Sequence, residues 1–397
     1  MSRLRSPGPA PARRTIVVLA AVLLHGCADP APTAPPIAAS GPELAVRLPA
    51  AGARGLTVMT RNLYLGGDIL ALGQPSPLPV PVRTAMLWGE IQASDFPERA
   101  GALAREIRDA RAHLVGVQEA PIYRIDPSGD AAVGGTNPAT VVALDFLAIL
   151  RDSLAALGVE YDVAAVRELT DVELPVLVSP GPPPSFIDVR YTDREAILVR
   201  RGVPTRNPGG GTFAARFSLT VSGITIEALR GWVSVEASVG GVWYRFVSTH
   251  LEVGGAAAPV QEAQARELVA ALAGERLPIV LVGDFNSPAD GSGTDSYAFL
   301  TGPGRFVDVW PEANRKSPGY TSPLPSSLFG PPSLDERIDL ILVRQGFGAA
   351  PAAGIVGGVH ADVVGEELGD RTASGRWPSD HAGVVAILRM PPALARR

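Results

Sequence analysis

Short apolar runs that end in a polar or charged residue recur along this chain. Residues 279–282 form a continuous aliphatic run, which is typical of a strand buried on both faces. Asp284 and Asn286 follow it directly, and they would point the same way if the extended conformation continued, because side chains alternate along a strand. An ordinary turn after a core strand is the alternative, since Asp, Asn and Gly all favour turns. Other segments with the same pattern decide between the two.

Further predicted strands carry a polar side chain at or near one end. Asn62 lies near the end of residues 56–64, and Glu119 ends residues 114–119. His250 follows the last of a series of segments that alternate or run apolar between Gly-containing turns, residues 213–221, 225–229, 232–239 and 242–248. Such a series predicts the hairpins of an antiparallel sheet.

An aspartate and a histidine near the end of the chain form a predicted pair. Asp339 sits within the apolar run 337–343, where an unpaired carboxylate would cost several kcal/mol. His381 precedes the final predicted strand, and we expect it to be the partner of Asp339. Such a pair fixes the imidazole tautomer and supports its cationic form, as proton transfer at a reacting oxygen requires.

Helical periodicity appears in residues 97–113, 137–157 and 260–273. Residues 68–95 are read as a Pro-rich, apolar insertion and residues 169–189 as an inserted irregular loop, and the glycines at 209–211 predict a turn. The insertions carry apolar side chains that could contact lipid or fold back into the core: Leu70, Leu72, Leu78, Met86, Leu87, Trp88, Leu174, Val176, Leu177 and Phe186.

The N-terminal region predicts an export signal and a tether. Arg13 and Arg14 precede a short apolar run over 15–24, and Cys27, the only cysteine of the chain, follows it after His25 and Gly26. This arrangement is typical of a secretory signal peptide and resembles the lipobox of bacterial lipoproteins, whose cysteine is lipidated. Residues 28–53 are rich in Ala and Pro and predict an extended tether. We therefore expect an exported protein anchored to a bacterial membrane through Cys27.

The formal charge of the chain is -5 and its basic residues are scattered, which argues against a purely electrostatic nucleic-acid binder. The domain boundaries that we predict are a signal peptide over 1–26, a tether over 27–53, one large α/β domain over 54–392 and a tail over 393–397. We expect a monomer.

The ordered set of polar strand ends resembles the endonuclease/exonuclease/phosphatase superfamily, which includes deoxyribonuclease I. The motifs that carry the resemblance are Asn62, Gln118-Glu119, His250, Gly283-Asp284-Phe285-Asn286, Arg337-Ile338-Asp339 and Ser379-Asp380-His381. The resemblance implies a four-layer α/β sandwich, in which two packed mixed β-sheets are flanked by helices. It also implies a Mg²⁺-dependent site at one edge of the sheets, with Mn²⁺ as a substitute.

The resemblance implies a role for each matching residue. Glu119 would bind the metal, with Asn62 and Asp380 as direct or water-mediated ligands. Asp284 and Asn286 would orient the nucleophilic water and hold the phosphate, while His250 and His381 would contact the phosphoryl oxygens and move protons, with Asp339 orienting His381. Glu195 matches an acidic partner of the first histidine, and Arg230 is a candidate phosphate contact.

The expected activity is hydrolysis of a phosphodiester by in-line attack of an activated water, most simply as an extracytoplasmic nuclease. The substrate would be a phosphate ester, either nucleic acid or phospholipid. A sphingomyelinase-like phospholipid phosphodiesterase, a phosphomonoesterase and a non-catalytic binding lipoprotein are the alternatives that the sequence leaves open.

Overall fold

The computed structural model describes residues 55–221, 224–346 and 360–389. The predicted signal peptide, the tether with Cys27 and the C-terminal tail lie outside these residues, so export and lipid anchoring stay predictions. None of the helices in the described ranges is long and apolar enough to cross a membrane.

The first sheet has eight strands in the order β15-β16-β1-β2-β6-β3-β4, with β5 paired to β6. It is mixed, because β1 runs parallel to β2 while the other neighbours are antiparallel. Its strands are β1 (Gly55–Asn62), β2 (Leu114–Gln118), β3 (Ile122–Asp126), β4 (Val141–Asp145), β5 (Tyr161–Ser179), β6 (Ser185–Arg200), β15 (His360–Val364) and β16 (Gly383–Arg389).

The second sheet has six strands in the order β13-β14-β12-β11-β10-β7. It is also mixed, since β11 and β12 are parallel. Its strands are β7 (Thr205–Thr212), β10 (Gly231–Val239), β11 (Val242–His250), β12 (Ile279–Asp284), β13 (Val307–Asp308) and β14 (Asp339–Arg344), and β8 (Phe217–Val221) and β9 (Ile224–Ala228) form a separate hairpin.

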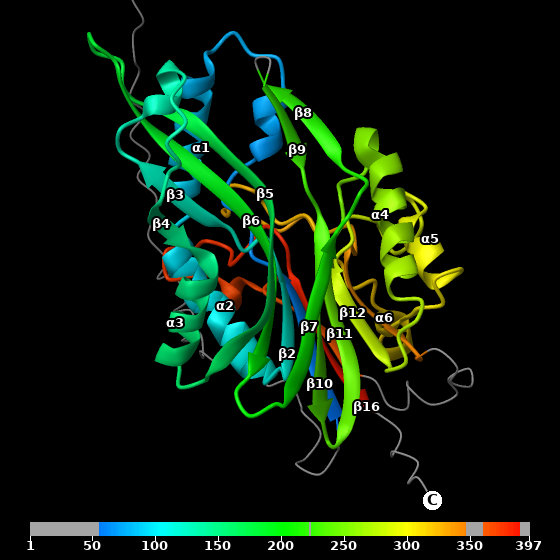
Figure 1. The fold of residues 1–397 in the computed structure, drawn as a ribbon. Helices are drawn as coiled ribbons and strands as arrows, with labels where there is room; N and C mark the ends of the chain where they lie inside the picture. Colours follow the sequence, from blue (N-terminus) through cyan, green and yellow to red (C-terminus); the bar gives the residue numbers. More distant parts are fainter. Residues whose placement is uncertain (1–54, 222–223, 347–359, 390–397) are drawn as a thin grey trace, which may run out of the picture. The chain divides into compact units, whose positions relative to one another are not determined.

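The two sheets pack face to face, and helices cover their outer faces (Figure 1). An aliphatic cluster that includes Val58, Ile197, Val235 and Val282 fills the space between the sheets. Gly116 allows their closest approach, because a Cβ there would lie 2.5 Å from the side chain of Val282. The helices are α1 (Val80–Ala93), α2 (Phe96–Ala110) and α3 (Phe146–Ala156) on the first sheet and α4 (Ala258–Ala271) and α5 (Ser296–Thr301) on the second. The short helix α6 (Val309–Ala313) packs against β14 and β15 and adds Val309 and Trp310 to the cluster between the sheets.

This arrangement confirms the predicted four-layer α/β sandwich. The short 3₁₀ helices η1 (Ile69–Gly73), η2 (Asp130–Val133), η3 (Gly255–Ala257) and η4 (Leu368–Asp370) lie in the connections. Most of the predicted strands and the helices over 97–113 and 260–273 are present within a few residues of their expected ends.

Both predicted insertions contain ordered elements. Residues 68–95 contain η1 and α1, and residues 169–189 belong to the long β5–β6 hairpin. The irregular loop predicted over 169–189 was wrong, because the prediction gave proline too much weight. Pro175 lies in β5, whose partner within the described part of the chain is β6, and an edge strand tolerates the loss of one N–H donor. Pro81 lies in the first turn of α1, where that donor has no intrahelical acceptor.

Two further predictions need correction. The segment 137–157 is only partly helical, because residues Val141–Asp145 form β4 before α3 begins. The glycines at 209–211 lie in β7 instead of a turn. A Cβ on Gly210 would lie 2.5 Å from the Trp232 carbonyl oxygen, so the missing side chain allows β7 to approach β10.

Candidate active site

The strand register brings three of the predicted site residues side by side. His250 ends β11 and is paired with Asp284 at the end of β12, which in turn is paired with Asp339 at the start of β14. On the first sheet, Asn62 and Gln118 are paired at the ends of β1 and β2. The polar residues that interrupt the apolar runs therefore meet at one edge of the packed sheets.

Backbone conformation at the strand ends turns the side chains toward this edge. Glu119 has a φ of 50° and Asn286 a φ of 49°, a left-handed conformation that interrupts the extended chain. Gly283 allows β12 to lie close to β11, because a Cβ there would lie 1.9 Å from the Thr249 carbonyl oxygen. A side chain at Gly283 would therefore separate the strands that carry His250 and Asp284.

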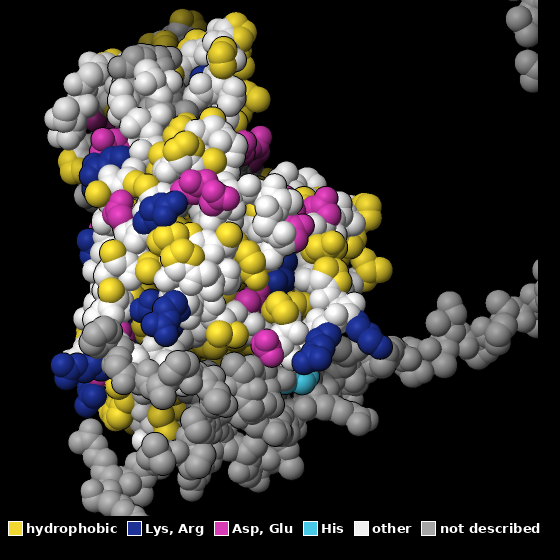
Figure 2. Space-filling view, turned by 90° about the vertical axis from the view of Figure 1, so that its right-hand side faces the viewer, with side chains coloured by type: hydrophobic (Ala, Val, Ile, Leu, Met, Phe, Trp, Pro, Cys, Tyr) yellow, Lys and Arg dark blue, Asp and Glu magenta, His cyan; other side chains and the backbone are white. Residues whose placement is uncertain are grey.

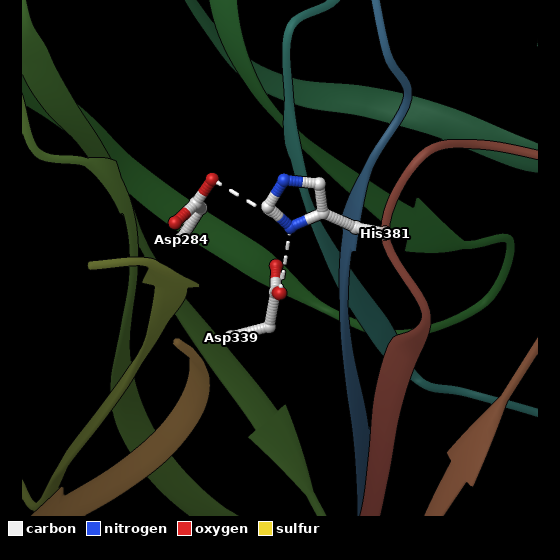
Figure 3. A group of neighbouring side chains, drawn as sticks. All are labelled: Asp284, Asp339 and His381. Carbon is white, nitrogen blue, oxygen red and sulfur yellow. Dashed lines mark hydrogen bonds and ion pairs between the residues drawn. The ribbon is translucent and has the colours of Figure 1, made fainter. Parts of the chain in front are cut away.

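His381 lies between two carboxylates, as Figure 3 shows. Its Nδ1 is 2.9 Å from Asp339 Oδ2 and 3.8 Å from Asp284 Oδ2. Burial alone would lower the pKa of His381, but Asp339, Asp284 and Asp380 outweigh this effect and raise the pKa well above its usual value. The structure therefore brings Asp339 and His381 together as expected, with the imidazole as a cation at neutral pH.

His250 has a different environment. Its Nδ1 is 2.8 Å from Arg230 Nη1, and because arginine only donates, Nδ1 accepts and the proton is on Nε2. Nε2 lies 3.4 Å from Asp284 Oδ2 and 3.1 Å from the amide nitrogen of Asn286. Burial, followed by the charges of Arg230 and His381, lowers the pKa of His250 well below its usual value. This histidine is neutral.

Glu195 does not contact His250, contrary to expectation. It is fully buried and accepts a hydrogen bond from Ser248 Oγ at 3.3 Å. The group next to His250 is the guanidinium of Arg230, which Asp193 and Glu252 flank at 3.8 Å each. The sequence could not show this, because Glu195 and Asp193 both occur in one charged segment of β6 and only the register decides which of them approaches the site.

Asn62 connects the two sheets at the site. Its amide nitrogen donates to Glu119 Oε1 and to Asp284 Oδ2, at 3.1 Å in both cases. Its oxygen accepts from the Tyr64 backbone N–H at 2.9 Å. In this orientation Asn62 positions two carboxylates and does not turn its oxygen toward them.

The predicted residues surround a pocket of about 380 Å³. Glu119, Asp284, Asn286, Asp380 and His381 line it, together with His250 and Arg230. Several other polar residues that line the pocket were not predicted from the sequence: Tyr64, Asp68, Thr170, Tyr191, Asp193 and Ser326. Asp193 had the clearest signal among them, because it stands in the charged segment that leads into a predicted strand.

The carboxylates of this pocket are suited to a hard cation. Oxygen atoms of Asp284 and Asp339 lie within 4.8 Å of each other and of a His381 nitrogen, and Asp339 Oδ1 is buried without a hydrogen-bond partner among the described residues. Burial raises the pKa of Asp284 to about 7. Burial also raises the pKa values of Glu119 and Asp380. For Glu119 the negative charge of Asp380 raises the pKa further. A divalent cation favours the charged carboxylates, so the donor set fits the implied Mg²⁺.

Comparison with known protein families gives a match over most of the described chain. A family model described as "Endonuclease/Exonuclease/phosphatase family" matches residues 84–381, which is more than half of the chain. No curated protein matches the sequence significantly.

Solved structures with a similar chain path have low sequence identity. An endonuclease/exonuclease/phosphatase family protein from Bacteroides thetaiotaomicron is 18% identical with a TM-score of 0.49, covering 86% of this chain and 98% of that one. A humanized D. rerio TDP2 is 14% identical with a TM-score of 0.47, covering 85% and 99%. A mannosyl-6-phosphatase from B. thetaiotaomicron is 18% identical with a TM-score of 0.46, covering 84% and 99%. Similarities at this level do not identify a substrate for this chain.

Proposed function

The chain belongs to the endonuclease/exonuclease/phosphatase family of phosphoester hydrolases, and from this premise we propose that it is a metal-dependent phosphodiesterase of the nuclease type. The observation that supports this most directly is the convergence of a cationic His381, a neutral His250 and several buried carboxylates on one pocket. A phosphodiester needs its negative oxygens neutralised and its attacking water aligned.

The metal would be held by Glu119 and Asp380, with Asp284 and Asp339 as the other available carboxylates. When bound, Mg²⁺ would neutralise phosphoryl oxygens and lower the pKa of a coordinated water. We infer that Asn62 keeps Glu119 and Asp284 in place through its two amide hydrogen bonds.

The protein side chains divide the remaining tasks according to their charge. His381 is a cation whose Nδ1 faces Asp339, and its other ring nitrogen would donate to a phosphoryl oxygen. Asp284 accepts from Asn62 and lies beside His250 Nε2, so it is the group that would accept a proton from the attacking water. His250 and Asn286 would donate to the phosphate.

The charge of the pocket favours a phosphodiester over a phosphomonoester. Among the lining residues, the cationic groups are Arg230 and His381, and Asp193 and Glu252 already flank Arg230. A diester carries one negative charge, whereas a monoester carries between one and two at neutral pH. The smaller charge needs less compensation.

The apolar side chains of the two predicted insertions weaken the case for a lipid substrate. Leu72, Trp88, Leu174 and Val176 are buried and line a small apolar cavity of about 40 Å³ between α1 and the β5–β6 hairpin. Of the ten residues considered, Leu78 and Met86 are strongly exposed, at 45% and 57%. Val178 of the same hairpin is also exposed, at 60%, but so few exposed apolar side chains do not form a broad lipid-contacting surface.

A parallel assay of the purified protein tests the proposed function. We expect cleavage of plasmid DNA with Mg²⁺, no cleavage with EDTA, and little turnover of sphingomyelin vesicles or a phosphomonoester. His381→Ala should lower kcat by about 10²–10⁴-fold while near-UV circular dichroism stays native. His360→Ala is the matched control, because His360 is exposed at the start of β15 and its loss should leave turnover unchanged.

Other outcomes would assign the protein differently. Preferred cleavage of sphingomyelin or of the monoester would replace the nuclease proposal with the corresponding hydrolase. Folded protein that cleaves none of the three substrates with Mg²⁺ or Mn²⁺ would contradict it in favour of a binding protein, and full activity of His381→Ala would remove His381 from the mechanism.

A further inference from the structure

A second cluster of carboxylates lies on the first sheet, away from the catalytic pocket. It consists of Asp126 at the end of β3, Asp130 at the start of η2 and Asp188 in β6, whose carboxylate oxygens lie within 4.8 Å of one another. Asp188 precedes the pocket residue Asp193 by five positions in the same strand, so the two sites are about 17 Å apart.

The strand register makes this cluster electrostatically unfavourable. Asp126 and Asp188 are directly paired across β3 and β6, and like charges at opposed positions destabilise an antiparallel pair. No ion pair within the described residues involves any of the three aspartates. Burial, followed by the charges of Asp130 and Asp126, raises the pKa of Asp188.

Two carboxylate oxygens of the cluster are buried and lack a partner. Asp188 is fully buried, and its Oδ1 makes no hydrogen bond to any described residue, as is also true of Asp130 Oδ1. The second oxygen of each carboxylate is used, since Ala131 N–H donates to Asp188 Oδ2 at 3.0 Å and Asn137 N–H to Asp130 Oδ2 at 3.3 Å. A buried carboxylate oxygen without a donor is costly, and either a proton shared between Asp188 and Asp130 or a bound cation would relieve this cost.

The connection between β3 and β4 is closed tightly around these oxygens. A Cβ on Gly129 would lie 2.4 Å from the Phe186 carbonyl oxygen, and one on Gly135 would lie 2.1 Å from Asp130 Oδ2. Ser128 donates from its backbone N–H and its hydroxyl to the two oxygens of Asp126, at 3.0 and 2.6 Å. The segment 126–137 thus supplies Asp126 and Asp130, and β6 supplies Asp188 from the neighbouring strand.

We propose that Asp126, Asp130 and Asp188 form a Ca²⁺ site that fastens the segment 126–137 to β6, close to the turn of the β5–β6 hairpin. Oxygen ligands on opposite sides of Ca²⁺ are separated by about 4.6–5.2 Å, twice the bond length of about 2.3–2.6 Å, so three oxygens that lie within 4.8 Å of one another can bind one ion. Ca²⁺ also tolerates irregular geometry, whereas Mg²⁺ demands a near-ideal octahedron. The site is separate from the catalytic metal and does not depend on the proposed function.

Counting bound calcium tests this site directly. The full protein is dialysed against Ca²⁺ with an excess of Mg²⁺ to occupy the catalytic pocket, and bound calcium is measured by mass spectrometry. Asp188→Asn keeps an oxygen that can accept from Ala131 N–H but removes the charge, and we expect it to lose one bound Ca²⁺ per chain. Asp152→Asn, at an exposed position of α3, is the matched control and should bind as much Ca²⁺ as the unmodified protein.

The unfolding temperature is a second readout, and the proposal predicts the direction in which it changes without and with Ca²⁺. In EDTA, Asp188→Asn should unfold at the same temperature as the unmodified protein or higher, because it removes an uncompensated buried charge. Added Ca²⁺ should raise the unfolding temperature of the unmodified protein and of Asp152→Asn, and have little effect on Asp188→Asn. If Asp188→Asn does not fold, Asp130→Asn takes its place in both measurements.

Two results would overturn the proposal. One is an unchanged calcium count in Asp188→Asn, and the other is a Ca²⁺-induced rise in unfolding temperature that is equal in the variant and the unmodified protein. Neither readout involves hydrolysis, so failure of the calcium site and failure of the proposed phosphodiesterase would be told apart.

Discussion

His250 and His381 occupy the same pocket and hold different charge states. Burial lowers the pKa of both, and the charges of their neighbours make the difference. Arg230 stands against Nδ1 of His250, whereas Asp339 stands against Nδ1 of His381. The positive neighbour favours the neutral imidazole and the negative neighbour favours the imidazolium. A site with one neutral and one cationic histidine can both hold a negative oxygen and transfer a proton at neutral pH.

His113 leads to a prediction at the residue scale. Its Nδ1 accepts from the Thr57 backbone N–H at 3.0 Å, and burial, followed by the charge of Arg200, lowers its pKa to about 4. The unfolded chain, with a histidine pKa of about 6.5, therefore binds the proton first as the pH falls. Stability from this group is complete above pH ~6.5 and is lost progressively toward pH 4.

The measurement is the free energy of unfolding in urea at pH 7.5 and pH 5. We expect it to fall more between these two pH values in the unmodified protein than in His113→Gln, which keeps an acceptor but cannot titrate. His360→Gln, at an exposed position, should show the unmodified pH dependence. Equal slopes in all three proteins would mean that His113 is not buried in its neutral form.

The limits of sequence reasoning at this scale are visible in Arg230 and Glu195. The catalytic candidates could be found because a polar residue that ends an apolar run is conspicuous, and the chain order of such residues is specific. Which side chains then touch depends on strand register and on residues from distant segments. Arg230 reaches His250 from another strand connection, and Glu195 instead reaches Ser248.

At the scale of elements, the boundary between β4 and α3 shows what periodicity alone does not resolve. Val141 and Leu144 fit the apolar face of a helix over 137–157, but they lie in a strand. Asp145 marks the boundary, because its carboxylate accepts from the Ala148 N–H and caps α3. β-Branched residues followed by an Asp indicate a strand that ends at the N-cap of a helix. The helical periodicity of the residues after Asp145 obscured this signal.

Asp145→Ala tests this boundary. The substitution removes the N-cap and the contact of 2.5 Å between Asp145 Oδ1 and Arg194 Nη2, and we expect the free energy of unfolding to fall by about 1–2 kcal/mol. Urea unfolding measures the change. Asp152→Ala, on the same helix but exposed, should change stability by at most about 0.5 kcal/mol. A loss in Asp145→Ala no greater than in Asp152→Ala would show that the cap contributes nothing.

The long β5–β6 hairpin could be predicted only by considering where each proline lies, because proline disrupts a central strand more than an edge strand or a turn. Between Leu169 and Val178, β5 alternates between more and less buried residues over much of its length, as a strand with one covered face does. Its prolines lie at an edge strand and in the turn between β5 and β6, where a missing N–H has little effect. This segment forms a strand because it pairs with β6, and no local sequence pattern reveals that pairing.

For the molecule as a whole, the layer order followed from the sequence because buried strands and amphipathic helices have few ways of covering one another. The distribution of charge is also informative. On the face that carries α4 and α5, acidic and basic side chains are interspersed (Figure 2), and the formal charge is -5. A chain with a negative formal charge and scattered basic residues has little general attraction for a polyanion, so binding of a phosphodiester would depend on the metal and the pocket.

This dependence gives a prediction about protons and metal. The carboxylates of the pocket lie close together, and burial raises the pKa of Asp284 to about 7 and also raises those of Glu119 and Asp380. Near neutral pH the metal-free pocket therefore retains protons, which Mg²⁺ must displace because it binds charged carboxylates. We expect Mg²⁺ binding to release protons, to release more of them at pH 6 than at pH 8, and to become tighter as the pH rises.

Isothermal titration calorimetry in buffers with different enthalpies of ionisation counts the released protons, because each one contributes the buffer's enthalpy to the observed heat. Asp284→Asn removes one of the titrating groups and should release fewer protons at pH 6, whereas Asp152→Asn should behave as the unmodified protein does. Heats that are independent of the buffer at pH 6 would mean that the carboxylates are already charged in the absence of metal. In that case cationic groups of the pocket, such as Arg230 and His381, would have to compensate the carboxylates before any metal binds.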